Sequence, residues 1–298
     1  MLIALLVPLT LAIAFYAVVL IRSALAKRII PSLEAVALGA ITNFFDTLGI
    51  GSFAPTMAWL KFRRLVPDRL IACTMLVGHT PPAMAQGFIF LILLGVLVEP
   101  VLLVGCVIAL LMGGLMGAPL VGKVRLWVIQ MIVAVALLLA AALYGVSNLD
   151  MMPGGGTATG LPLHWMIVAI AANFVFGLLL NFGVGNYAPT LVMLSLMGMD
   201  PKLCFPIMAA GAGLCGAGAS IRHISLGQID LRIAIGITLG GIPAVLVAAF
   251  IVQSMPLEFL RWLVMVVVLY AAMVMLKAAV GGRGESEALA TVTRAGGA

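Results

Sequence analysis

Nine long apolar stretches, joined by short connections, constrain the fold of this chain more than any other feature. They cover residues 2–21, 35–60, 70–96, 100–119, 125–146, 163–198, 203–221, 232–253 and 258–277. A helix of about 20 apolar residues crosses the hydrocarbon core of a bilayer. Backbone groups in lipid must also be hydrogen-bonded within the protein, which a helix achieves by itself. The sequence therefore predicts an all-α polytopic membrane protein.

Composition excludes several other classes of protein. Hydrophobic residues make up 64% of the chain and charged residues 9%, against about 45–50% and about 25% in soluble domains. A nucleic-acid-binding protein, a coiled coil or a disordered chain would need more charged or polar residues. The four cysteines are isolated within apolar stretches, which is typical of packing thiols. We expect no metal site, no cofactor and no nucleic-acid partner.

The distribution of basic residues indicates how the stretches cross the bilayer, because Lys and Arg collect on the cytoplasmic side. In one layout, stretch 35–60 enters from the cytoplasm, breaks at Gly49 and Gly51, and returns. Stretch 163–198 does the same from outside, with its break at Gly183 and Gly185. All but two of the sixteen Lys and Arg are then cytoplasmic. This layout predicts an external N-terminus, seven crossings, two re-entrant hairpins and a cytoplasmic C-terminus. Its first crossing is too long for a signal peptide.

A duplicated motif supports the two hairpins. Residues 49–56 read GIGSFAPT and residues 183–190 read GVGNYAPT, which agree at five of eight positions with a shift of 134. Each copy would hold a re-entrant broken-helix hairpin plus three transmembrane helices, so the second copy would be inverted, as in many transporters. The predicted division is an N-terminal transmembrane helix with its flank (1–30), repeat 1 (31–146), an external linker (147–162), repeat 2 (163–280) and a disordered cytoplasmic tail (281–298).

The two Gly-x-Gly breaks form the candidate substrate site. Glycine permits a tight turn and close approach of a ligand, and amides at helix N-termini favour a small anion. A tight helix crossing is the alternative role of such small residues. Hydroxyls and carboxamides beside the breaks could donate to an oxyanion or bond the local backbone. The expected substrate-binding residues are Asn43, Gly49, Gly51, Ser52 and Thr56 from the first copy, and Asn181, Gly183, Gly185, Asn186 and Thr190 from the second.

Asp46 and His79 are ionisable residues placed deep within apolar stretches. Such residues usually face a cavity, pair or titrate. We expect Asp46 either to couple transport to protons or to fix the hairpin as a neutral or hydrogen-bonded carboxyl. His79 precedes two prolines, and we expect it either to relay protons or to donate to a carbonyl that the prolines free. Arg222 and His223 are expected at the cytoplasmic face, where they would gather anions at the entrance or anchor the topology.

Two further motifs accompany the duplicated octapeptide, namely residues 220–230 (SIRHISLGQID) and residues 240–244 (GGIPA). Together they resemble the TauE/SafE sulfite exporter family, also called the TSUP permeases, over roughly residues 35–280. The resemblance implies an inner-membrane permease that moves small sulfur-containing or organic anions, often outward. Many relatives have a third glycine where this chain has Ser52, which could narrow the pocket or add a donor. The first apolar stretch lies outside the repeated core.

The expected function is export of a small anion, either sulfite or an organosulfonate, by a multi-pass secondary transporter of the bacterial inner membrane. Alternating access would operate at a midplane site. A negative-inside potential favours anion export by about 2.3 kcal/mol per charge per 100 mV, so protons are an optional partner. Uptake of another small solute is the alternative within this class. An intramembrane hydrolase with Ser52 as nucleophile and His79 as base would not explain Asn186 at the matching position, so we expect no enzyme.

Overall fold

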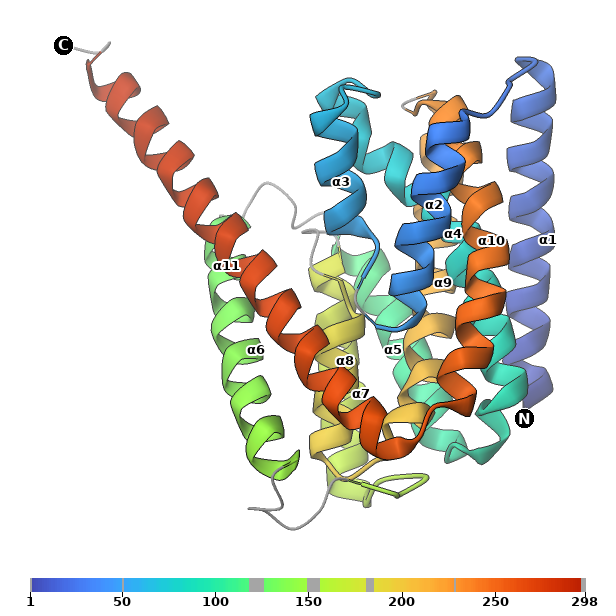
Figure 1. Ribbon diagram of the computed structural model, residues 1–298, viewed down its shortest axis with the longest axis vertical. Helices are drawn as coiled ribbons and strands as arrows, with labels where there is room; N and C mark the ends of the chain where they lie inside the picture. Colours follow the sequence, from blue (N-terminus) through green and yellow to red (C-terminus); the bar gives the residue numbers. More distant parts are fainter. Residues whose placement is uncertain are drawn as a thin grey trace.

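Helices make up most of the described part of the protein. The computed structural model describes residues 2–49, 51–117, 126–148, 156–180, 185–227 and 229–295 (Figure 1). In chain order the helices are α1 (Leu2–Ala26), α2 (Leu33–Thr47), α3 (Phe53–Phe62), α4 (Asp68–Leu93), the 3-10 turn η1 (Gly95–Leu97), α5 (Pro100–Gly117), α6 (Leu126–Asn148), α7 (Leu163–Leu180), α8 (Tyr187–Leu196), α9 (Pro201–Ser225), α10 (Leu231–Ser254) and α11 (Leu257–Ala295). Within these ranges no strand forms, and one isolated bridge pairs Ala158 with Met199. The predicted all-α architecture is confirmed for this part of the chain.

Seven helices of the described residues are long and apolar enough to cross a bilayer. The segments are Leu6–Ala26, Leu70–Leu93, Pro100–Gly117, Leu163–Leu180, Pro201–Ser225, Leu231–Ser254 and Glu258–Gly282. The number equals the expected number of crossings, but the set differs. α7, expected as one arm of a hairpin, qualifies, whereas α6 contributes the shorter apolar stretch Trp127–Leu139. This set of helices agrees with a multi-pass membrane protein.

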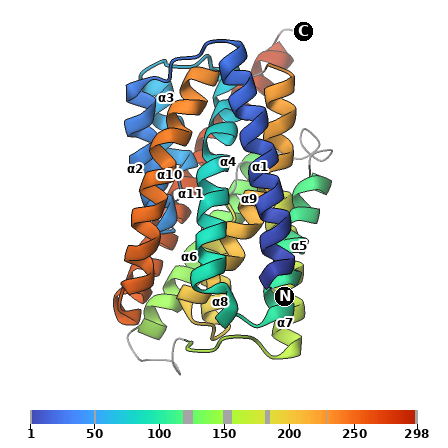
Figure 2. The same cartoon turned by 90° about the vertical axis from the view of Figure 1, so that its right-hand side faces the viewer.

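Two helical hairpins enter the bundle from opposite ends (Figures 1 and 2). α2 runs inward from the end where α1 stops, and α3 returns to that end. α7 runs inward from the other end, and α8 returns there. α3 and α8 each have ten residues, which makes them about 15 Å long, against a hydrocarbon core of about 30 Å. Neither helix is long enough to cross a bilayer.

The turn of the first hairpin depends on two glycines. Gly49 has a φ of 96° and Gly51 a φ of 87°, in the left-handed region that other residues rarely adopt. The backbone amides of Leu48 and Gly49 close the end of α2 by donating to the carbonyls of Phe45 and Asp46. The first expected helix break is therefore confirmed. Asn181 and Gly183, expected at the second break, lie outside the described residues.

Each hairpin packs mainly on a helix from the other half of the chain. α2 lies along α10, and α7 lies along α5. A Cβ added to Gly39 of α2 would collide with the backbone of Ile237, and one added to Gly113 of α5 would collide with the backbone of Phe174. Such close approach at small residues is a common mode of helix association in membranes. α4 packs on α9, and α6 packs on α11.

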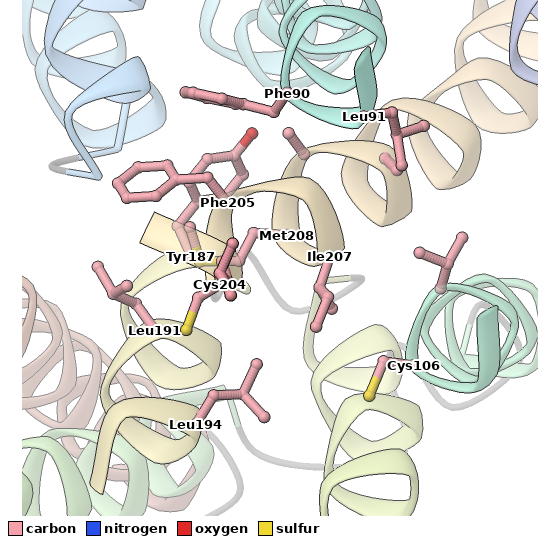
Figure 3. Close-up of a cluster of buried hydrophobic side chains, with 14 of the residues drawn as sticks. Phe90, Leu91, Cys106, Tyr187, Leu191, Leu194, Cys204, Phe205, Ile207 and Met208 are labelled. Atoms are coloured by element: carbon pink, nitrogen blue, oxygen red, sulfur yellow. The ribbon is translucent and has the colours of Figure 1, made fainter. Parts of the chain in front are cut away.

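Part of the main hydrophobic core lies where α4, α8 and α9 meet (Figure 3). Phe90 of α4 and Phe205 of α9 are fully buried, with ring centroids 5.1 Å apart. Leu191 of α8 and the free thiol of Cys204 belong to the same cluster. This apolar cluster holds α8, and with it the residues that begin the returning arm of the second hairpin.

The positions of the helix ends show at which face of the molecule several basic residues of the described ranges lie. α1, α3 and α9 end at the face of the molecule where the C-terminus lies, and α4 and α10 begin there (Figure 1). Lys27, Arg28 and Arg64 follow two of these helix ends, whereas Lys202 lies at the opposite face, in the first turn of α9. This arrangement agrees with the sidedness that the sequence predicts.

α11 includes residues that the sequence assigns to a polar tail. The helix continues to Ala295 and projects from the bundle beyond α6 (Figure 1). Its apolar part, Glu258–Gly282, is the segment that qualifies as a membrane span. The domain boundary expected at residue 281 therefore falls within a helix.

Candidate functional site

The first hinge, which we define as residues 48–52, is closed by a side chain of its own hairpin. Asp46 Oδ1 accepts a hydrogen bond from the backbone amide of Ser52 at 2.7 Å. Both residues are buried, and a carboxylate beside the first amides of a helix is electrostatically favourable. Asp46 thus joins the end of α2 to the start of α3, which is one of its two expected roles. Its coupling to protons stays a prediction.

His79 connects α4 to both arms of the first hairpin. Its Nδ1 lies 3.0 Å from Asn43 Oδ1 on α2, and its Nε2 lies 3.0 Å from Thr56 Oγ1 on α3. The Asn43 amide donates to the Gly39 carbonyl, so its oxygen is the acceptor for Nδ1–H, and Nε2 accepts from the Thr56 hydroxyl. A neutral imidazole satisfies both contacts. Three expected site residues therefore form one buried chain of hydrogen bonds.

The prolines after His79 free two carbonyls of α4, as the sequence predicts, but other residues bond them. Because proline has no N–H, Pro81 leaves the Val77 carbonyl without its helical donor, and Pro82 does the same to the Gly78 carbonyl. The Tyr16 hydroxyl of α1 donates to the Val77 carbonyl at 2.9 Å. The Thr238 hydroxyl of α10 donates to the Gly78 carbonyl at 2.9 Å. His79 uses its two nitrogens on side chains instead.

The second hinge is defined as residues 181–186, and its described residue Asn186 is bonded to α9. Its described residues begin at Gly185, which is exposed, and Asn186, which is buried. The Asn186 amide donates to the Met208 carbonyl at 3.3 Å. Further along α8, the Thr190 hydroxyl donates to Asn173 Oδ1 of α7 at 3.3 Å. Thr190 thus joins the two arms of its hairpin directly, where Thr56 joins the arms of the first through His79.

Residues of the two hairpins come together inside the bundle. A Cβ on Gly49 would lie 3.4 Å from Leu191 Cδ2 of α8, whereas a Cβ on Gly51 or on Gly185 would meet no atom within 4 Å. Asp46 and Tyr187, the first residue of α8, are close enough to interact electrostatically. The first hinge therefore contacts α8, and each hinge has a glycine that borders open space.

A cavity of about 500 Å³ lies apart from these hinge residues. It lies between α6 and the second hairpin, and its lining includes Ile132 of α6, Phe176 of α7 and Val192 of α8. None of the expected substrate-binding residues lines it. Its walls are mainly apolar, and Trp165 is the one lining residue whose side chain carries a donor, so we do not assign the substrate to it.

An ion pair joins the outer ends of α2 and α3. Arg63 Nε donates to Glu34 Oε1 at 2.8 Å, and Trp59 Nε1 donates to the same oxygen at 3.0 Å. The hydrogen bond from Arg63 holds the pKa of the partly exposed Glu34 carboxyl below its usual value. The first hairpin is therefore closed at its outer end as well as at its hinge.

The remaining expected site residues lie at the end of α9. Arg222 and His223 are in its last turn, where cations are favoured by the helix dipole. The Arg222 side chain is exposed, whereas Ser220, just before it, is buried and bonds Thr80 of α4 at 2.9 Å. Both expected roles of Arg222 and His223, at an entrance or as anchors, stay predictions.

The hydrolase alternative requires Ser52 to be paired with His79, and the hydrogen bonds of His79 do not provide this pair. His79 Nε2 contacts the Thr56 hydroxyl, and Nδ1 contacts Asn43, so Ser52 is not paired with the expected base. Among the described residues, no group of three or more His, Cys, Asp or Glu side chains could hold a metal ion. The polar residues of the hinges can position and bind, but they do not form a nucleophile with its base.

Several polar residues at the hinges are not predicted from the sequence. Tyr187 of α8 donates to Oε1 of Gln86 on α4 at 3.1 Å, and Tyr16, Thr238 and Asn173 have the contacts described above. The four-residue spacing from each proline identifies the freed carbonyls, but it does not identify the donors. Gln86 and Tyr16 carry no motif, because their contacts depend on how distant helices pack.

Comparison with known proteins matches the second half of the chain to a protein family. Residues 165–297 match the family model described as Sulfite exporter TauE/SafE, which confirms the predicted resemblance over this part of the chain. No curated protein and no solved structure matches. With the seven apolar helices, this match to a family of transporters indicates a multi-pass membrane protein that acts in transport.

Proposed function

We propose that the protein is a secondary transporter that exports a small anion through a site between the first and second hinges. One observation carries this proposal: Gly51 and Gly185, at matching positions of the duplicated motif, both border open space. Irregular backbone at membrane depth is tolerated where protein or water covers it. Amides next to helix N-termini attract negative charge. The hinges therefore have the polarity that an anion requires.

The site belongs to two inverted repeats, over residues 31–146 and 163–280. The bounds of α8 are those of α3 shifted by 134 residues, the same shift that relates the two motifs. Helices of one half also pack on helices of the other half, since α2 lies on α10 and α7 lies on α5. Inverted repeats that rock about a central site provide alternating access. Opening toward one side and then the other would carry the anion across.

The substrate is sulfite or a small organosulfonate. The matched family is described as sulfite exporters. The polar side chains at the hinges include hydroxyls and carboxamides rather than fixed cations, although those of Thr56, Asn186 and Thr190 donate to protein groups in this structure. Neutral donors bind an oxyanion without the cost of a buried unpaired charge. In the inner membrane of a bacterium, the negative-inside potential would favour outward movement.

Asp46 gives the site a second partner, the proton. An anion beside an ionised carboxyl is repelled, and a proton on Asp46 would remove this repulsion. Binding of the anion and binding of the proton would therefore favour one another, which is the basis of coupled movement.

Flux measurements in vesicles test the proposal. Purified protein is placed in vesicles loaded with sulfite, sulfoacetate, thiosulfate or acetate, with and without a pH gradient and with a set membrane potential. We expect sulfite or sulfoacetate to leave faster than from protein-free vesicles, and faster when the potential drives anions outward. No protein-dependent flux of any of these anions would contradict the proposal, and faster inward than outward flux at zero potential would favour uptake.

Two glycine variants locate the site. Gly185→Ala adds a methyl group at the second hinge without meeting protein atoms, so we expect it to obstruct the anion and to reduce flux. Gly218→Ala on α9 is the matched control, because its methyl group also faces open space and its φ is not positive. Equal flux from both variants and the unaltered protein would show that the anion does not pass Gly185.

A further inference from the structure

We propose that Gln86 supplies a side-chain N–H group that recognises an oxygen of the transported oxyanion. This inference rests on the proposed function and adds a specificity-determining residue to the hinge site. Gln86 lies in the second half of α4 and its side chain is fully buried. No part of the duplicated motif contains it, and its place at the hinges follows from packing alone.

Gln86 has one half of its amide bonded and the other half unbonded. The Tyr187 hydroxyl donates to Oε1 at 3.1 Å, which fixes the orientation of the amide and directs Nε2 away from Tyr187. Among the described residues, none accepts a hydrogen bond from Nε2, although this atom is buried. Buried polar groups in proteins are nearly always bonded. An unbonded buried amide therefore points to an acceptor that is present during function.

The position of Gln86 is set by α9, the helix to which Asn186 of the second hinge is bonded. Gly87, the next residue, lies against Ala209 and Ala210 of α9, so closely that a Cβ would lie 3.0 Å from their backbone atoms. Asn186 of the second hinge bonds the Met208 carbonyl one residue earlier on α9. Gln86 and the second hinge are therefore held against the same turn of α9.

The first hinge is linked to Gln86 through Tyr187 and Asp46. Tyr187, which orients Gln86, interacts electrostatically with Asp46, and Asp46 bonds the amide of Ser52. On the other side, the cluster of Phe90, Phe205 and Met208 closes the region with apolar side chains (Figure 3). An N–H group in such surroundings forms a stronger hydrogen bond than one exposed to water.

This arrangement fits an oxyanion better than other ligands. Nε2 offers two N–H donors, and a proton on Asp46 would remove the repulsion that its carboxylate exerts on the anion. A neutral amide also binds without forming a buried ion pair, so release remains rapid. The ligand class is a small, singly or doubly charged oxyanion with at least one unshielded oxygen.

Two substitutions of Gln86 test the inference in the full-length protein in vesicles, with sulfite as the probe. Gln86→Met keeps the volume but removes the donor, and we expect the KM for sulfite efflux to rise about tenfold, as loss of one good hydrogen bond predicts. Gln86→Glu keeps an acceptor for Tyr187 but replaces the donor by a carboxyl, and we expect a larger rise in KM. Sulfite should also raise the melting temperature of the unaltered protein in detergent more than that of either variant.

Control variants separate recognition from structure. Tyr187→Phe leaves the donor but removes the group that orients it, so the rise in KM should be smaller than for Gln86→Met. Thr74→Val removes a buried polar group of α4 that accepts from the Asp230 amide, and it should lower the melting temperature without changing KM. If Gln86 only held Tyr187, Gln86→Glu would retain the normal KM and Gln86→Met would match Tyr187→Phe.

Each result bears on the inference. An unchanged KM in both Gln86 variants, with sulfite flux intact in the unaltered protein, would overturn the role of Gln86 and leave the proposed function standing. If the unaltered protein neither moves sulfite or sulfoacetate nor gains a higher melting temperature from them, the proposed function fails and the role of Gln86 fails with it.

Discussion

The two hairpins share a backbone pattern but are stabilised in different ways. In the first hairpin, Asp46 bonds the amide of Ser52 across the break. The matching position of the second hairpin is Leu180, which has no polar group, and Asn186 bonds α9 instead. A duplicated motif therefore preserves where the helices break, while the side chains decide what holds each break. The first hinge is braced within its own hairpin, and the second is anchored to a neighbouring helix.

A consequence for function follows from this difference. The ionisable carboxyl belongs to the first hinge, whereas the described polar groups of the second hinge are neutral. Charge coupling, if Asp46 provides it, would act through one repeat, and the other would supply neutral donors. Five substitution experiments, from the largest expected effect to the smallest, can break or sharpen this distinction.

Asp46→Ala should have the largest effect on transport. It leaves the buried amide of Ser52 without an acceptor, which costs about 1–3 kcal/mol, and it releases the first hinge. We expect sulfite flux in vesicles to fall at least about tenfold, since about 1.4 kcal/mol corresponds to a factor of ten. Leu180→Ala is the matched control and should retain more flux. Equal flux from both variants would erase the distinction between the hinges.

Asp46→Asn separates bracing from proton coupling. The Asn oxygen can still accept from the Ser52 amide, so the melting temperature should stay close to that of the unaltered protein. If Asp46 carries the proton, flux of this variant should no longer respond to a pH gradient. Unchanged pH-driven flux would leave Asp46 with the bracing role alone.

His79→Ala should destabilise the protein more than Thr190→Val. The first change removes both contacts of the imidazole, to Asn43 and to Thr56, and leaves a cavity, at a cost of about 2–4 kcal/mol. The second removes one hydrogen bond, to Asn173, at about 1 kcal/mol. Unfolding followed by tryptophan fluorescence in detergent measures both. The reverse order would mean that the second hairpin, not the first, depends on its buried polar contacts.

Tyr16→Phe should have a moderate effect on α4. It removes the donor to the Val77 carbonyl, at a cost of about 1 kcal/mol, and Thr238→Val should do the same to the Gly78 carbonyl. Circular dichroism and the melting temperature of both variants measure the change. A melting temperature unaffected by either variant would show that the proline-freed carbonyls need no donor, and that His79 is positioned without them.

Glu34→Gln should have the smallest effect. Arg63 lowers the pKa of Glu34, so its contribution to stability is present above the unfolded-state pKa and is lost as the pH falls through the folded-state pKa. We expect the melting temperature of the unaltered protein to approach that of Glu34→Gln as the pH is lowered below the normal range of glutamate, and also in high salt. A difference that persists at low pH would point to a role of Glu34 other than the ion pair.

The sequence predicts the local features of this fold well because local residues determine them. Long apolar runs predict helices, and the Gly-x-Gly break predicts the turn at Gly49 and Gly51, where the structure has positive φ angles. The packing thiols are also predicted from their apolar neighbours. The set of helices that qualify as spans differs because α7, predicted as one arm of a hairpin, is itself long and apolar enough to cross, whereas α6 contributes only a shorter apolar stretch.

The hinge contacts are predicted less completely because they join residues distant in the chain. Asn43, Thr56 and His79 are each expected near the site, but their mutual bonds depend on how α4 lies against the hairpin. Tyr16 and Gln86 have no sequence signal, since a tyrosine or glutamine within an apolar helix gives no indication of its partner. Pro81 and Pro82 identify the carbonyls that need donors, but they do not identify the donors.

The packing of helices from one half of the chain on helices of the other half has a consequence for biosynthesis. α2 leaves the ribosome early, whereas α10, the helix that covers its glycine face at Gly39, is made near the end of the chain. Until then the first hairpin lacks its main contact surface, and its short helices cannot span the bilayer. The first half of this protein therefore stays incompletely folded in the membrane until the second half has been synthesised and inserted.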